Sequence, residues 1–364
     1  MKFMYDNEFI RYNTNNIFLM FKENDNAMLS KMNKFDIDYF LYFLKSYNLE
    51  YRKRLNISSD VTFGLEIELE HFKGTIYDFF PFEKDINNIV GNNEWDIKND
   101  ITLVYGRELA TEIYTDTEKT WTDIENVCNF SEKKLEVGKR SAGHVNIGSH
   151  ILGNNTLYWY RLLKLWGTYE NVIYRFSYGE YLSYFPYMKD SSKPIGDIIL
   201  NRLDMYKDHI KDDAFRFVLD AFPRRSELGF LKKNGLSFYK MFDEYNYSKF
   251  KKDLVVEIRT PLSTLDYIIW QNYVNFFVRL MLYCKSDNFN EDILDGRIYK
   301  VNDIIGDIDS YDNVYLEQAL ELSDMIFDNN KDKIYFLKQY LKGFEISSEK
   351  YKKAEKFTRK RDLY

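Results

Sequence analysis

Strict alternation of apolar and polar residues runs from Val61 to Phe72, in the sequence VTFGLEIELEHF. A period of two is typical of a half-buried strand, whose successive side chains point to opposite faces. The buried face would carry Phe63, Leu65, Ile67 and Leu69, and the other face Gly64, Glu66, Glu68 and Glu70. Glutamates two positions apart on a strand lie about 7 Å apart and repel by roughly 2 kcal/mol at an effective dielectric constant near 20. The pattern fits either a solvated face, which we expect for Glu70, or a face that holds cations.

Three later segments alternate in the same way: RELATEIYT from Arg107, AGHVNIGSH from Ala142 and DLVVEIRTP from Asp253. Each has an apolar face and a polar one. On the second strand, Leu109, Thr111 and Ile113 would lie opposite the acids. If the four strands form one antiparallel sheet with their polar faces together, one set of side chains converges: Glu66, Glu68, Glu108, Glu112, His144, Glu257 and Arg259. So many carboxylates in one place require cations.

The rest of the chain reads mainly as helix. The first 60 residues form a helical preface in which Phe35, Tyr39, Phe40 and Phe43 share a stripe. After Pro261 helical periodicity dominates, with Thr264 as the expected N-cap of the next helix and a solvated basic segment from 349 to 364. The sequence predicts an α+β fold: a curved antiparallel sheet with an acidic concave face and helices on its outer side. We divide it into a preface (1–60), a catalytic domain (61–285) and a helical extension (286–364).

Composition narrows the function classes. With 364 residues and 45% hydrophobic content, the chain can bury one large core or two ordinary ones. A net charge of -6 argues against non-specific binding of nucleic acid. Cys128 and Cys284 have no paired or metal-ligand spacing and are expected to be buried thiols. We find no leader-like or membrane-spanning apolar run and expect a soluble, cytoplasmic protein that binds no membrane. Glycine-rich phosphate loops are also absent from the sequence.

Oxygen-rich sites with an occasional imidazole suit Mg²⁺ or Mn²⁺, which keep coordination positions open for water or phosphate oxygens. An arginine beside such carboxylates makes sense as a fork for phosphate. Metal together with phosphate indicates nucleotide chemistry.

Five motifs in order resemble the amidoligase family, carboxylate-amine ligases of glutamine-synthetase-like fold. They are G-x-E-x-E from Gly64, NDITL from Asn99 after a tryptophan, E-L-A-T from Glu108, GHV from Gly143 and EIR from Glu257. Each motif is weak alone, but the order is fairly specific, and the resemblance covers roughly Val61 to Leu282. It implies a fold, a cofactor and a set of residue roles.

By this resemblance, metal ions that bridge the ATP phosphates would be held by Glu66, Glu68 and Glu108, with Glu112 as a fourth ligand and with His144 and Glu257 completing the second metal position. Arg259 would grip the transferred phosphate, and Asp100 would contact substrate or orient the amine. Lys139 and Arg140 are further basic candidates for phosphate binding and are also explained as surface charges. Asn146 replaces the second histidine of the family pattern; its amide can hydrogen-bond a phosphate oxygen but carries no charge.

The implied reaction uses ATP and Mg²⁺ (or Mn²⁺) to join a carboxylate donor to an amine acceptor on a small molecule, a peptide or a protein, through an acyl phosphate. Two alternatives remain open: a metal-dependent phosphoesterase or nuclease, and an inactive scaffold that binds a partner. Single residues have plainer explanations too. His144 alone would be structural, Arg259 an ion-pair partner of Glu257, and Asp100 a turn residue. Neither substrates nor oligomeric state can be read from the sequence.

Overall fold

The computed structural model describes residues 26–32, 37, 40, 43–44, 47–91, 95–138, 140–178, 192–206, 217–218, 232–241, 254–301 and 308–341. Phe40 and Phe43 of the expected preface stripe are buried. Phe35, Tyr39, Lys139 and the basic segment 349–364 lie outside the described residues.

One antiparallel sheet of six strands organises the described chain, in the order β2-β3-β1-β4-β6-β5. The strands are β1 Phe63–Leu69, β2 Asp96–Lys98, β3 Arg107–Ala110, β4 Gly143–Gly148, β5 Leu236–Ser237 and β6 Val255–Ile258. The four strands predicted from alternation are the four inner ones. The predicted mixed α+β fold with an antiparallel sheet is therefore confirmed.

The apolar face of this sheet is covered by helix. Leu65, Ile67, Val145 and Ile147 are almost completely buried, and helix α10, Tyr267–Tyr283, packs against β4. Gly143 permits this close approach, because a Cβ there would lie 2.5 Å from the ring of Trp270. The apolar side chains of β1 and β4 are therefore part of the core, and the polar side chains of these strands lie on the opposite face.

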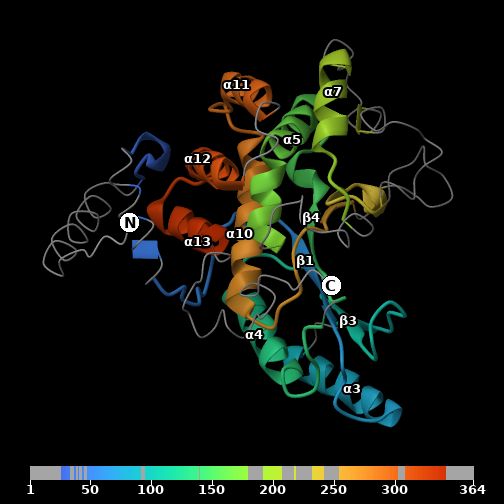
Figure 1. Cartoon of the computed structure of the whole chain (residues 1–364). Helices are drawn as coiled ribbons and strands as arrows, with labels where there is room; N and C mark the ends of the chain where they lie inside the picture. The colour runs from blue at the N-terminus through green and yellow to red at the C-terminus, as the bar shows by residue number, and fades with distance from the viewer. Residues whose placement is uncertain are drawn as a thin grey trace, which may run out of the picture.

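Eight α-helices lie within the described residues. Besides α10 they are α3 Phe79–Val90, α4 Glu118–Ser131, α5 Thr156–Tyr178, α7 Gly196–Tyr206, α11 Glu291–Val301, α12 Ile308–Ile326 and α13 Asn330–Tyr340. In Figure 1, α10 runs through the centre, with α12 and α13 on one side and the strands on the other. None of the helices described is long and apolar enough to cross a membrane.

The start of α10 differs from the prediction by two residues. Asp266, not Thr264, is the N-cap, and its side chain accepts a hydrogen bond from the Ile268 amide at 3.0 Å. The Thr264 hydroxyl instead accepts from the Asp266 amide at 3.0 Å, so it shapes the turn before the helix. The two cysteines are free and buried, as expected, in α4 and directly after α10.

The predicted alternation fails at the end of β3. Ala110 pairs with Glu66, but the next bridge along joins Tyr114 to Phe63, so this chain has one residue more than its partner between the two pairs. Such an extra residue is a bulge, which reverses the facing of the side chains after it. Ile113, expected on the buried face, is 65% exposed.

Buried charges tie the N-terminal segment to the last two helices. Lys333 of α13 is fully buried, and its Nζ donates to the Ala27 carbonyl at 2.6 Å and to Asp324 Oδ1 at 2.8 Å. Asp324 of α12 also accepts from the backbone amides of Leu29 at 3.0 Å and Ser30 at 2.7 Å. Two segments about 300 positions apart are thereby fixed to each other.

Replacing Asp324 by alanine should lower the free energy of unfolding by about 3 to 5 kcal/mol, because it leaves the buried ammonium of Lys333 without its counter-ion. Urea denaturation measures the change. The matched control is Asp328→Ala, whose carboxylate is 75% exposed and 4.0 Å from Arg279; it should shift stability by less than about 1 kcal/mol. Equal effects of the two substitutions would contradict this account.

Candidate functional site

The polar face of the sheet presents its side chains in rows across the strands. Glu68 pairs with Glu108 of β3, Glu66 lies between Ala110 of β3 and His144 of β4, and Gly64 pairs with Asn146. Successive rows lie about 7 Å apart along β1, so the three rows span about 14 Å. Most of the side chains predicted to converge do so, but they divide into two groups.

We call Glu66, His144 and Glu257 the central group; each of the three offers an atom within 4.8 Å of the others. His144 Nδ1 donates to Glu66 Oε2 at 2.8 Å and lies 3.8 Å from Glu257 Oε1. Glu257 is 1% exposed and the other two are largely buried. Two carboxylates this deeply buried need a positive charge close by.

Lys240 supplies that charge. It belongs to the short 3-10 helix η6, Tyr239–Met241, and its Nζ bonds Glu66, lies 2.9 Å from Glu257 Oε1 and donates to Asn146 Oδ1 at 3.1 Å. Sequence reasoning missed this residue. It lies in a stretch without clear periodicity, and nothing in its neighbours distinguishes it from a surface lysine.

The central group is consequently a closed ionic network. Burial alone would raise the pKa of Glu66, but the hydrogen bond from His144 and the charge of Lys240 outweigh it and hold that pKa far below its usual range. The pKa of Glu257 is likewise lowered against the effect of burial, by His144, Lys240 and Arg259. Burial would lower the pKa of Lys240, yet the two carboxylates raise it. The side chains of Glu66, Glu257 and Lys240 therefore stay charged near neutral pH.

Arg259 and Asn146 flank this network. The Arg259 guanidinium donates to Glu257 Oε1 at 3.1 Å, which places it on the polar face beside the central group. Asn146 donates from its amide nitrogen to Glu66 Oε1 at 2.9 Å while its oxygen accepts from Lys240. Asn146 therefore bridges Lys240 and Glu66 and fixes their relative positions.

We call Glu68, Asp100 and Glu108 the outer group; their carboxylates also lie within 4.8 Å of one another. Burial raises the pKa of Glu68, and the negative charges of Asp100 and Glu108 raise it further. The pKa of Glu108 is raised by burial and by Glu66. The nearest lysine among the described residues, Lys98, is half-exposed and 3.8 Å from Glu108. Counted over the described residues, the outer group thus has negative charge in excess.

Asp100 is a turn residue, which is one of the two roles weighed for it, and its carboxylate also belongs to the outer group. Its Oδ1 accepts from both the amide and the hydroxyl of Thr102 at 2.7 Å, the pattern of a turn closed by a side chain. The same turn carries its carboxylate to Glu68 and Glu108. Arg140 donates from its guanidinium to the Thr102 carbonyl at 3.2 Å, so a cationic side chain borders the outer group.

Glu70, expected to be solvated, is instead 1% exposed. Its carboxylate accepts from the Val104 amide at 2.9 Å and the Arg140 amide at 3.1 Å. Gly138 makes room for it, because a Cβ there would collide with the Glu70 carboxylate. Glu70 was mispredicted because two loops distant in sequence close over the end of β1, and it joins the loop of Asp100 to that of Arg140.

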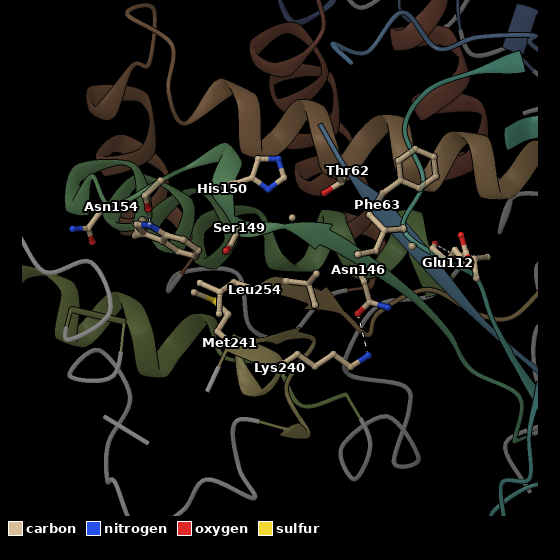
Figure 2. Close-up of a pocket in the computed structure, with 17 residues that line it drawn as sticks. Thr62, Phe63, Glu112, Asn146, Ser149, His150, Asn154, Lys240, Met241 and Leu254 are labelled. Atoms are coloured by element: carbon tan, nitrogen blue, oxygen red, sulfur yellow. Dashed lines mark hydrogen bonds between the residues drawn. The ribbon is translucent and has the colours of Figure 1, made fainter. Parts of the chain in front are cut away.

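A cavity of about 810 Å³ opens at the other end of the polar face. Figure 2 shows Asn146 and the stem of Lys240 at its inner side, with Met241 and Leu254 along one wall. Glu112 lines the cavity and is exposed. Because of the bulge after β3, the structure does not bring Glu112 into either carboxylate group.

No protein-family model, no curated protein and no solved structure matches this chain. The site is accordingly interpreted from its own geometry.

Replacing Lys240 by methionine should lower the free energy of unfolding at pH 7 by about 3 kcal/mol, because two buried carboxylates lose their shared cation. Because the pKa values of Glu66 and Glu257 are lowered in the folded protein, the two carboxylates stabilise it at pH values above their unfolded-state pKa. That contribution is lost in the variant. The deficit relative to wild type should shrink as pH falls below about 4.3, the unfolded-state value, because wild type loses this contribution as pH falls toward the lower folded-state pKa values of the two carboxylates.

Urea denaturation at a series of pH values measures this effect. Lys53→Met is the matched control, because Lys53 forms an exposed ion pair with Glu118 at 2.8 Å. It should change stability by less than about 1 kcal/mol at any of these pH values. A pH-independent loss in the Lys240 variant would argue against charge compensation as the role of this lysine.

Proposed function

We propose that this protein is an ATP-dependent carboxylate-amine ligase with a glutamine-synthetase-like catalytic fold. The observation that carries the proposal is the pair of carboxylate groups side by side on one face of an antiparallel sheet, with Arg259 next to them. Paired acidic sites with an adjacent guanidinium fit the transfer of a phosphoryl group, where positioning and charge neutralisation supply most of the acceleration.

The outer group is suited to a divalent cation. It offers carboxylate oxygens from β1, β3 and the loop after β2. A cation would offset both the burial and the repulsion by Asp100 and Glu108 that raise the pKa of Glu68. Oxygen ligands of this kind favour Mg²⁺ or Mn²⁺ over zinc. Bound there, the cation would neutralise charge on the phosphate oxygens of ATP.

The central group fits a different role, because its charge is already balanced. Lys240 lies where Glu66 and Glu257 could otherwise hold a cation. We therefore assign the ligand function to the outer group in the nucleotide-free protein. The central group would hold Arg259 at a fixed position, from which its guanidinium N–H donors can meet the γ-phosphate, with the charge of Lys240 close by.

The proposed ligation has two steps, formation of an acyl phosphate and its attack by the amine. In the first, an oxygen of the substrate carboxylate attacks the γ-phosphorus, the bond from that phosphorus to the β,γ-bridging oxygen breaks, and ADP leaves. In the second, the amine nitrogen attacks the acyl carbon, the bond to the phosphate oxygen breaks, and the amine proton passes to a base. Fixed positive charge from Arg259 and Lys240 would stabilise the charge that develops on the transferring group.

Isothermal titration calorimetry with ATP, with and without Mg²⁺, tests the proposal without knowledge of the substrates. Wild type should bind ATP only with Mg²⁺, and Glu68→Gln should weaken that binding by at least about tenfold, because it removes a charged oxygen ligand. The matched control is Glu136→Gln; this exposed glutamate pairs with Lys73, and its loss should leave ATP affinity unchanged.

Three results would count against the ligase. No ATP binding with Mg²⁺ or Mn²⁺ would favour a binding scaffold. Binding that survives Glu68→Gln would separate the nucleotide from the outer group. Hydrolysis of phosphodiesters by the same carboxylates, without any need for ATP, would favour a phosphoesterase.

Binding of Mn²⁺ in the absence of nucleotide separates the two groups. Wild type should bind one Mn²⁺ per chain, measured by the loss of the free-ion signal in electron paramagnetic resonance. Glu108→Gln in the outer group should weaken binding by at least about tenfold, because it removes one of three charged ligands.

The control is the same substitution in the central group. Glu257→Gln should leave the Mn²⁺ affinity within about twofold, because Lys240 already compensates that group. Two bound ions in wild type, or stronger weakening by Glu257→Gln than by Glu108→Gln, would reverse the assignment.

A further inference from the structure

We propose that the cavity beyond Lys240 binds the amine substrate, and that this substrate is a primary amine on an apolar stem. The inference rests on the proposed ligase function, because only a ligase would use the bound amine as a substrate. Its evidence is the position of the cavity relative to the two carboxylate groups and the chemistry of the cavity lining.

Position is the first argument. Along β1 the outer group lies at Glu68, the central group at Glu66 and the cavity at Gly64, in steps of about 7 Å. A nucleotide held through its phosphates at the outer group would direct its γ-phosphate toward Lys240 and Arg259. The cavity lies on the far side of Lys240, where a group that attacks the activated carboxylate would enter.

The polar lining is the second argument, because much of it accepts hydrogen bonds. Glu112 is the one acidic residue among the described residues that line the cavity, and it is exposed. His150 Nε2 lies 2.7 Å from the Asp60 carbonyl; since a carbonyl only accepts, Nε2 carries the hydrogen and Nδ1 is the acceptor of the neutral ring. Such a lining attracts an amine, which donates, and repels a carboxylate or a phosphate.

Lys240 is the one cationic side chain among the described residues that line this cavity, and it does not reverse that preference. Figure 2 shows its stem along the cavity and its ammonium turned to Asn146. The ammonium also pairs with Glu66 and Glu257, so two carboxylates already balance its charge. An anion in the cavity would have to compete with them.

The remaining walls are apolar, and they favour a ligand whose amine is attached to an apolar chain. They include Trp159, Met241, Leu254 and Val255. About 810 Å³ is far more than ammonia needs and lies within the range of pockets for drug-sized ligands. An alkyl or arylalkyl chain therefore fits better than a small polar amine.

The probe is n-hexylamine, with hexanoate and adenosine as matched comparison ligands, and its binding to the full chain is measured by ligand-observed NMR titration. Hexylamine should bind wild type and hexanoate should not. Glu112→Gln should weaken hexylamine binding about tenfold through loss of a charge-assisted hydrogen bond, whereas Glu136→Gln should leave it unchanged.

A second variant tests the same cavity sterically. A Cβ at Gly64 would lie 3.4 Å from the Glu112 carbonyl and Thr111 Oγ1, so Gly64→Ala adds a methyl group beside the cavity without a severe clash. It should weaken hexylamine by at least about threefold. Gly296→Ala, where nothing lies within 4 Å of the added atom, should have no effect on binding.

The inference is overturned if wild type binds hexanoate as well as it binds hexylamine. It is also overturned if neither Glu112→Gln nor Gly64→Ala changes the affinity for hexylamine. Adenosine that displaces hexylamine, or ATP affinity that falls in Glu112→Gln, assigns the cavity to the nucleotide base and also overturns it. Glu68→Gln should leave hexylamine affinity unchanged. If wild type binds hexylamine through Glu112 but binds no ATP, the proposed ligase function is contradicted and the amine-binding site is still supported.

Discussion

The polar face depends on one interaction, the ammonium of Lys240 between the carboxylates of Glu66 and Glu257. Both glutamates come from strands whose opposite faces pack into the core, so neither can turn away to water without breaking the sheet. Taking two such charges out of water costs several kcal/mol per ion unless a partner of opposite sign is held at contact distance. Lys240, supported by His144, Asn146 and Arg259, is that partner.

This compensation is local, and its limits explain the contrast between the two groups. One row along β1, Glu68 forms no ion pair with a lysine of the described residues, and its carboxylate relies on the Ala142 amide at 2.7 Å and on His144 Nε2 at 3.9 Å. Burial and neighbouring acids raise its pKa, whereas burial fails to raise the pKa of Glu66. The same sheet therefore carries one satisfied acidic group and one that a cation would stabilise.

Periodic features were predictable from the sequence, and aperiodic ones were not. Four strands and their facing followed from alternation, because burial of one face imposes a period of two on the residues. The bulge after Ala110 left no trace in the pattern, and it removed Glu112 from the acids with which alternation had grouped it. Lys240 and Glu70 were misjudged for a related reason: their roles come from chain segments that meet only in three dimensions.

The arrangement along β1 also explains why a strand, and not a loop, underlies the site. A strand places every second residue on one face at a nearly constant interval. β1 pairs with β3 and with β4, and α10 packs on the opposite face of β4, where Gly143 allows the close approach of Trp270. Glu68, Glu66 and Gly64 are thereby fixed relative to one another before any ligand binds. Preorganised charge is worth more than charge that must reorient, because no free energy is lost to rearrangement when a ligand arrives. Packing of the apolar face thus fixes the positions of the charges on the polar face.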